Sequence, residues 1–175
     1  MIQRRQDGST EFYRDWSDYK NGFGSLKGEH WLGNDNIFTI VNGKSYKLRI
    51  DIEDWSGEWR YAQYEIFKIA DESEEYKLTL AGYSGNAGDA MLDNVIQEIN
   101  LTGQIFSTRD RDNDIWPNGQ CTSSRRSGWW FKMCSYCNPN GIYFPETVPG
   151  SFGIYWYPWK NSFEGMQSVI MKVKH

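Results

Sequence analysis

The sequence predicts an α+β fold with a small antiparallel sheet, short helices and a long loop-rich segment. Three observations lead to this prediction: helical apolar spacing near the N-terminus, alternating strand patterns in residues 46–83 and 168–174, and little regular pattern between them. The 175 residues are about one domain long, and no linker or repeat divides them. We therefore expect a single domain, with a sheet and helix scaffold in residues 1–105 and a loop-rich half in residues 106–175.

The first expected element is a helix in the segment STEFYRDWSDYKNGFG, which starts at residue 9. Ser9 or Thr10 can cap its start, and Phe12, Trp16 and Tyr19 fall on one face before a glycine follows its end. A second short helix is expected to begin near residue 31. These two helices would precede the strands of the scaffold.

The strands follow from period-two alternation. Residues 46–52 alternate apolar and charged side chains, which indicates a half-buried strand. Residues 61–69 and 76–83 are expected as neighbouring antiparallel strands, with WSGEW as the first turn, and residues 168–174 form the last strand. Loops as long as those between residues 84 and 167 are usually functional in a compact domain.

The composition argues against several classes of function. A net charge of −4 provides no basic footprint for nucleic acid. No stretch is apolar for the roughly 18 residues of a membrane-spanning helix, and the N-terminus has no apolar signal-peptide core, so a secretion signal would lie upstream. An enzyme is not expected, because His30 and His175 place no base beside a nucleophile. The aromatic share of 17% suits a loop-rich core or a binding surface.

Cys121, Cys134 and Cys137 lie in one short stretch, and an odd count leaves one thiol over. The CSYC pair could be half of a zinc site or a redox pair, but zinc needs four nitrogen or sulfur ligands and both histidines are remote in sequence. One disulfide and one spare thiol is the stronger interpretation. Asn100 begins an Asn-Leu-Thr acceptor pattern for glycosylation.

The stretch FSTRDRDNDIWPNGQC, residues 106–121, places Asp110, Asp112 and Asp114 at alternate positions. Either these carboxylates sit in water as an acidic turn, or they hold a cation such as calcium, which takes six to eight oxygen ligands. An EF-hand loop is excluded, because position six counted from Asp110 is Ile115 instead of glycine and position twelve is Cys121 instead of glutamate.

Several stretches together resemble the fibrinogen-related domain, the C-terminal module of fibrinogen, ficolins, tachylectins, tenascins and angiopoietins. They are IQRRQDGSTEFYRDWSDYKNGFGSLKGEHWLGN, YKLRIDIEDWSGEWRYAQYEIFKI, FSTRDRDND, SGWWFKMC and the NPNGIY stretch after Cys134. The resemblance covers residues 2–174 and implies a fibrinogen C-terminal-like fold. The family module starts earlier, with a small subdomain that is missing here, so the sequence is either a fragment or a natural truncation. Cys137 also departs from the family, and it would pair with a partner chain, pair with the absent segment or stay free.

The resemblance implies that the acidic loop is a structural calcium site. The family pattern D-x-D makes Asp112 and Asp114 the side-chain ligands, and the backbone carbonyls of Trp116 and Asn118 (or Gly119) complete the set. This loop is one residue longer than usual before the cysteine. The first aspartate of the run is expected to support the loop from outside the ligand set.

In lectin-like members of the family, an acetyl group is held beside a disulfide that corresponds to Cys121–Cys134, next to a cis peptide bond that would join Met133 to Cys134 here. Ser135 stands where the lectin pattern usually has histidine, and Arg125 stands where a tyrosine walls the pocket. The expected ligand-binding residues are Arg125, Met133, Cys134, Ser135, Tyr136 and Phe152. Replacement pocket walls could come from Tyr136, Tyr143, Tyr155 and Trp156, whereas Trp129 and Trp130 are expected in the core.

The expected function is that of a secreted, extracellular and calcium-stabilised recognition module, with lectin-like binding of acetylated or anionic glycans in innate defence. The alternative is an angiopoietin-like module that binds a cell-surface receptor, and the charges of Arg125 and Arg126 would favour an anionic ligand or a protein partner. Family members often form homo-oligomers through upstream regions, which are absent from this sequence.

Overall fold

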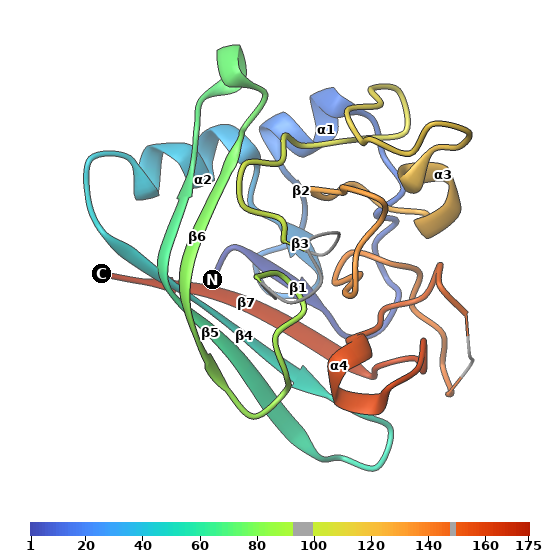
Figure 1. The fold of residues 1–175 in the computed structure, drawn as a ribbon. Helices are drawn as coiled ribbons and strands as arrows, with labels where there is room; N and C mark the ends of the chain where they lie inside the picture. Colours follow the sequence, from blue (N-terminus) through green and yellow to red (C-terminus); the bar gives the residue numbers. More distant parts are fainter. Residues whose placement is uncertain (93–99, 148–149) are drawn as a thin grey trace.

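The computed structural model describes residues 1–92, 100–147 and 150–175, and it contains one seven-stranded antiparallel sheet among them (Figure 1). The strands are β1 (Gln3–Arg5), β2 (Phe23–Gly24), β3 (His30–Trp31), β4 (Tyr46–Glu53), β5 (Trp59–Ile69), β6 (Leu78–Gly85) and β7 (Ser168–Lys174). Their spatial order is β2-β3-β1-β7-β4-β5-β6. The last strand therefore lies in the middle of the sheet, between β1 and β4, and ties the end of the chain to its beginning.

Short helices accompany the sheet. They are α1 (Trp16–Asn21), α2 (Asn34–Val41), the 3-10 helix η1 (Glu72–Glu74), α3 (Cys121–Arg125) and α4 (Tyr157–Lys160). Helix α1 packs against α2, and α2 packs against β5. The described part of the chain contains no helix that is long and apolar enough to span a membrane. Most of the chain between β6 and β7 runs as loops beside the sheet, as the loop-rich pattern predicted (Figure 1).

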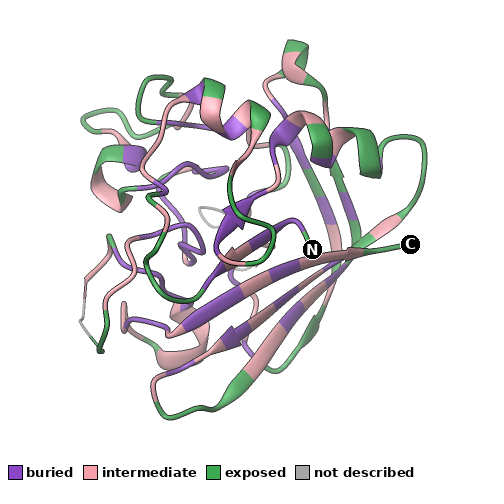
Figure 2. Cartoon of the chain, turned by 180° about the vertical axis from the view of Figure 1, so that it is seen from behind, coloured by how far each residue is buried: buried purple, intermediate pink, exposed green. Residues whose placement is uncertain are grey.

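The strand predictions for residues 46–52, 61–69 and 168–174 are confirmed. Along β4, Leu48, Ile50 and Ile52 are fully buried while the residues between them are partly exposed, an alternation that Figure 2 shows on the strands. Strand β6 begins two residues later than predicted. Glu75 and Tyr76 adopt a left-handed backbone conformation that ends the preceding turn, so pairing starts only at residue 78.

The predicted helix from residue 9 is largely wrong, because α1 begins only at Trp16. A carboxylate distant in sequence takes the backbone donors that a helix would use: Glu29 accepts hydrogen bonds from the backbone N–H of Thr10, at 2.9 Å, and of Gly8, at 3.0 Å. Tyr13 N–H bonds to the side chain of Glu11 at 2.7 Å. Residues 9–15 are therefore extended or irregular. The second helix, α2, begins three residues after the predicted position.

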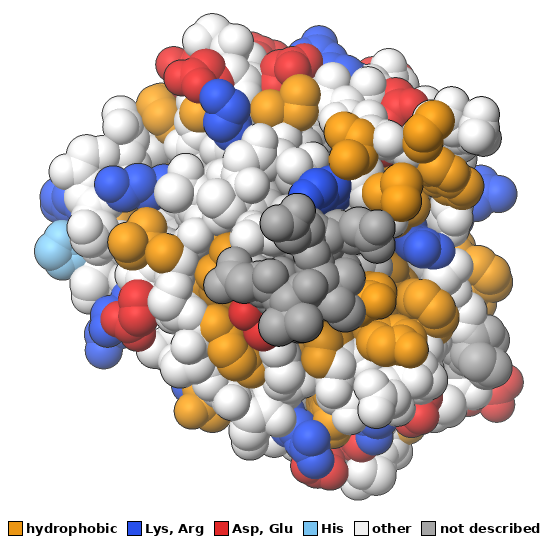
Figure 3. Space-filling model, in the orientation of Figure 1, with side chains coloured by type: hydrophobic (Ala, Val, Ile, Leu, Met, Phe, Trp, Pro, Cys, Tyr) orange, Lys and Arg blue, Asp and Glu red, His pale blue; other side chains and the backbone are white. Residues whose placement is uncertain are grey.

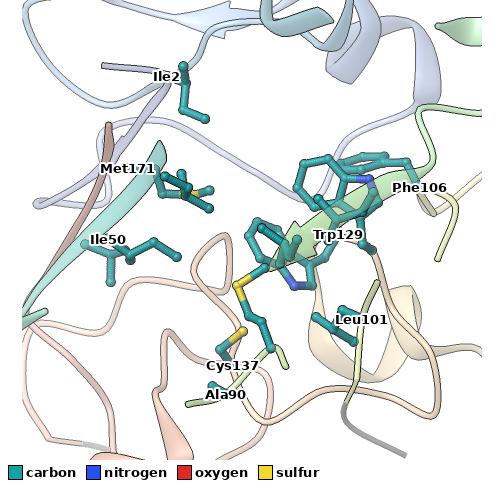
Figure 4. Packing of buried hydrophobic residues seen from close by; sticks show 14 of the residues in the cluster. Ile2, Ile50, Ala90, Leu101, Phe106, Trp129, Cys137 and Met171 are labelled. Atoms are coloured by element: carbon teal, nitrogen blue, oxygen red, sulfur yellow. The ribbon is translucent and has the colours of Figure 1, made fainter. Parts of the chain in front are cut away.

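The core joins the sheet to the loop-rich half. Figure 4 shows Ile50 and Met171 on the sheet facing side chains of the loops, among them Trp129 and Phe106. Trp129 and Trp130 are fully buried, as predicted, and their ring centroids lie 5.0 Å apart in an edge-to-face arrangement. Because aromatic rings from distant segments interlock in this way, the irregular loops have a fixed support.

Candidate functional site

Hydrogen bonds to two other parts of the chain hold the start of the acidic loop in place. Ser107 pairs with Trp129 through two backbone hydrogen bonds, at 2.9 and 3.1 Å. Asp110 accepts from the backbone N–H of Trp16, at 2.8 Å, and from the hydroxyl of Thr108, at 2.7 Å. Asp110 thus supports the loop by linking it to the start of α1, the role expected for it from sequence.

Asp114 organises the second part of the loop. One of its oxygens accepts from the backbone N–H of Trp116 at 2.8 Å, and the other accepts from the backbone N–H of Cys121 at 2.7 Å. Asp114 N–H in turn lies 3.3 Å from a carboxylate oxygen of Asp112. Burial, and then the neighbouring charge of Asp112, raise the pKa of the Asp114 carboxyl above its ordinary value. The two carboxylates are therefore held close together.

The donor set around this pair suits a hard cation. Among the described residues no three His, Cys, Asp or Glu side chains gather into a metal-binding cluster, so a cation here would depend on two carboxylates and on carbonyl oxygens. The Trp116 carbonyl receives only a long contact, 3.5 Å, from Gly119 N–H, which leaves it available as a ligand. Asn118 is exposed in the same turn. An all-oxygen set with two carboxylates fits calcium.

Gly119 has a steric role that the sequence did not indicate. A Cβ built on this residue would lie 2.7 Å from the indole ring of Trp116. Only glycine therefore lets the tryptophan fold back over the turn. The position of Trp116 at the tip of the loop depends on this close approach.

The predicted disulfide joins Cys121 to Cys134, with Cα atoms 5.4 Å apart. It links the start of α3 to the second loop, where the peptide bond between Met133 and Cys134 is cis, as the resemblance implied. The two loops are also joined by a 2.9 Å hydrogen bond from Ile115 N–H to the carbonyl of Lys132. The acidic loop and the loop that precedes Cys134 therefore form one connected unit.

Three large hydrophobic side chains on this unit are exposed to solvent. The exposed fractions are 56% for Ile115, 37% for Trp116 and 46% for Met133, and we call these residues the apolar patch. Figure 3 shows hydrophobic side chains gathered at the upper right, where Figure 1 draws the loops around α3. Large exposed apolar side chains on neighbouring, cross-linked loops are typical of a binding surface.

The residues expected to wall an acetyl pocket are arranged differently from that expectation. Ser135 is buried, and its carbonyl accepts the hydroxyl of Tyr155 at 2.9 Å. Tyr155 and Trp156 are each only 1% exposed, so they belong to the core and not to a pocket wall. The guanidinium of Arg125 lies 6.0 Å from the ring centre of Tyr155 and 5.6 Å from that of Phe163. Arg125 thus packs against Tyr155, one of the side chains expected as a replacement pocket wall, and against Phe163.

The remaining expected pocket residues are separated from one another. Tyr136 stacks on Tyr157, with ring centroids 4.9 Å apart, and Tyr143 packs near Trp55. Phe152 is 41% exposed and lines a different groove of about 360 Å³. The other residues of that groove are Glu11, Tyr13, Arg126 and Ile142. The sequence alone does not indicate this groove, because its residues come from three distant segments.

Cys137 is a free and fully buried thiol. Burial raises its pKa to about 12, and its backbone N–H donates to the Ser135 hydroxyl at 3.2 Å. Among the described residues Cys137 is thus a free thiol, and pairing with a partner chain or with an upstream segment stays an untested alternative. Asn100, the glycosylation candidate, is partly exposed and accepts from Thr102 N–H at 3.0 Å, and its modification stays a prediction.

The whole chain, residues 1–175, matches the family described as the C-terminal globular domain of fibrinogen beta and gamma chains. The chain belongs to this family. It is 43% identical to fibrinogen-like protein 1 of Rattus norvegicus and 41% identical to angiopoietin-4 of Bos taurus. Both alignments cover 99% of the present chain. It spans 58% of the first relative and 34% of the second, so it corresponds to only part of these proteins.

Solved structures agree with this membership. The fibrinogen-like globe domain of human ANGPTL2 superposes with a TM-score of 0.90 at 39% identity, covering 99% of this chain and 78% of that one. A lamprey fibrin D-dimer, solved with the peptide ligand Gly-His-Arg-Pro-amide, has a TM-score of 0.89 at 35% identity and covers 98% and 59% of the two chains. The fibrinogen C-terminal fold predicted from the sequence is confirmed.

Proposed function

We propose that this fibrinogen-related domain is a non-enzymatic recognition module that binds a protein ligand at the cell surface, the angiopoietin-like alternative. The observation that carries the proposal is the apolar patch. Ile115, Trp116 and Met133 are exposed on loops that a disulfide, a backbone hydrogen bond and the Asp114 carboxylate hold in place. Large apolar side chains on a rigid support are the usual anchors of protein interfaces.

The arrangement around Arg125 supports a protein ligand over an acetylated sugar. Its guanidinium lies over Tyr155 and Phe163, and Ser135 faces the interior. A small neutral acetyl group would have to displace this charged side chain. A protein surface could instead contact the guanidinium and the apolar patch together, and arginine is enriched at protein interfaces. The structural relative solved with a peptide ligand is consistent with such binding.

Calcium is proposed as a structural partner of the patch. Bound between Asp112 and Asp114, it would neutralise two neighbouring carboxylates and steady the turn that carries Trp116. Asp114 already bonds to the backbone of Trp116 and of Cys121, so ordering this carboxylate orders the loop and the disulfide together. An extracellular location is proposed as well, because disulfides such as Cys121–Cys134 persist in oxidising compartments.

The proposal is tested by binding of the labelled protein to intact cells. Binding should be saturable, sensitive to protease treatment of the cells and insensitive to N-acetylglucosamine. The variant I115S/M133S should bind at least about tenfold more weakly, because buried interface anchors contribute 1 kcal/mol or more each.

A matched control is the variant L26S/I66S, which removes two hydrophobic side chains that are 70% and 39% exposed elsewhere on the molecule. It should bind like the wild type. Elution by acetylated sugars would support the lectin-like function instead. Equal binding by I115S/M133S and the wild type would contradict the proposed role of the patch.

A further inference from the structure

Strands β4 and β7 place positive charges directly opposite one another on the partly exposed face of the sheet. In the antiparallel register, Lys47 faces Lys174 and Arg49 faces Lys172. Like charges in directly opposed positions destabilise a sheet. We call these two opposed pairs the basic ladder. Because they repel each other across the strands, they do not stabilise the folded sheet.

Nearby carboxylates neutralise only part of the basic ladder. Asp51 forms ion pairs of 2.8 Å with both Arg49 and Lys172, and Glu65 forms one of 2.6 Å with Lys47. Lys174 has no carboxylate partner among the residues that the structure describes. The four cations thus share two carboxylates, although the protein as a whole carries a net charge of −4.

The basic ladder lines a groove of about 430 Å³. The lining residues are Met1, Lys47, Arg49, Gln63, Lys172, Val173 and Lys174. Residues two apart on a strand are separated by about 6.5–7 Å, and opposed residues by about 4.5–5.5 Å, so the Cα atoms of the four residues form a compact rectangle. Because all four cations line the groove, a narrow anionic chain lying along it would contact all four side chains.

We propose that the basic ladder binds a linear sulfated polysaccharide of the extracellular surface. Regularly spaced sulfate groups would neutralise the opposed cations and remove the repulsion between the strands, and the aliphatic stems of Lys and Arg would contact the sugar rings. This site uses β4 and β7 and is separate from the apolar patch. It would hold the domain at a cell surface while the loops engage a protein ligand.

The test uses heparin as the probe, with the wild type compared with K172Q/K174Q. The control is K68Q/K77Q, which removes the same charge from two exposed lysines near the β5–β6 turn. Affinity for immobilised heparin is measured from 50 to 300 mM salt, and thermal melts confirm that each variant is folded. Uncharged dextran and vesicles that contain phosphatidylserine are run in parallel.

The wild type should bind heparin and not dextran, with a strong dependence on salt. In K172Q/K174Q the slope of log K against log salt should fall by about two, about one for each cation removed. The melting temperature should change little, because the variant loses both the repulsion across the strands and the ion pair of Lys172 with Asp51. K68Q/K77Q should match the wild type. Equal slopes for the two double variants, no heparin binding by the wild type at 150 mM salt, or stronger binding to vesicles than to heparin would each overturn the proposal.

Discussion

Glu29 offers the sharpest test of how the N-terminal segment is held. Its side chain is fully buried, and one oxygen accepts from the backbone N–H groups of Gln6, Asp7 and Gly8 at 2.8, 3.1 and 3.0 Å. The other oxygen accepts from Thr10 N–H, at 2.9 Å, and forms a 2.8 Å ion pair with Arg5, which is itself 3% exposed. One carboxylate thus receives five hydrogen bonds.

The substitution E29Q keeps the size of the side chain but replaces one acceptor oxygen with a donor amide and removes the charge that pairs with Arg5. Whichever oxygen is replaced, at least two hydrogen bonds are lost, at about 1.5 kcal/mol each for bonds to a charged group. E29Q also leaves the buried charge of Arg5 without its carboxylate partner. Together these losses should lower the unfolding free energy by about 3–5 kcal/mol. For a domain of this size that corresponds to a melting temperature lower by about 6–20 °C.

The assay is urea unfolding together with calorimetry, on the wild type, E29Q and the control E74Q. Glu74 is exposed and, among the residues that the structure describes, its side chain pairs with Lys77 alone, at 2.9 Å, so its substitution should change the unfolding free energy by less than about 1 kcal/mol. A fall of less than 1 kcal/mol for E29Q, or equal effects of the two substitutions, would refute the argument that this carboxylate holds residues 5–10 in place of a helix.

Three further predictions follow from single side chains. Burial by itself would raise the pKa of Asp54, but hydrogen bonds from the Lys160 ammonium and from nearby backbone and hydroxyl groups hold it well below its ordinary value. D54N should therefore lower the unfolding free energy by about 2 kcal/mol at pH 7. The difference from the wild type, measured by urea unfolding, should shrink as the pH falls below about 4, because the Asp54 carboxyl then becomes protonated in the unfolded chain while the folded protein still holds it ionised. A constant difference down to pH 2 would contradict this. The thiol of Cys137 is fully buried, and its pKa is raised to about 12. It should therefore not react with a thiol reagent at pH 8 until the protein unfolds. Rapid labelling of the native protein would contradict this by showing that the thiol is accessible. G119A should displace the indole of Trp116, and this should change the tryptophan fluorescence and weaken ligand binding. Alanine at a glycine with free space around it should leave the fluorescence and the binding unchanged. Unchanged fluorescence in G119A would refute the steric role of this glycine.

Gly28 is the matched control for the last of these experiments, because a Cβ at that position meets no atom within 4 Å. G28A therefore tests whether the effect of G119A comes from the contact with Trp116 and not from the general cost of replacing a glycine in a loop.

The strands that could be predicted from sequence are those long enough to show an alternation of apolar and polar residues within the strand itself. Strands β4 and β7 are long enough for alternation to be visible, and both were located correctly. Strands β2 and β3 have two residues each, which is too short to establish a period, so the sheet is wider than predicted. The error at α1 has another cause: its competitor, Glu29, lies far along the chain, and local patterns contain no information about that contact.

The candidate site was predictable to the extent that it rests on covalent or local features. The Cys121–Cys134 disulfide was expected from the resemblance, and the bonds of Asp114 to the backbone of Trp116 and Cys121 span only two and seven residues. The bond from Trp16 N–H to Asp110 spans 94 residues and has no local signal in the sequence. The placement of Arg125 over Tyr155 could not be predicted, because it depends on how α3 packs against a segment 30 residues away. Exposure of the apolar patch likewise becomes visible only in three dimensions.

The measurement that tests the account most directly is a calorimetric titration of calcium into the wild type and into D112N/D114N, with thermal melts in calcium and in chelator. We expect one calcium site in the wild type, a higher melting temperature in calcium, and loss of both effects in the variant. Identical melts and no heat of binding in the wild type would contradict the claim that a calcium ion organises the loop beneath the apolar patch.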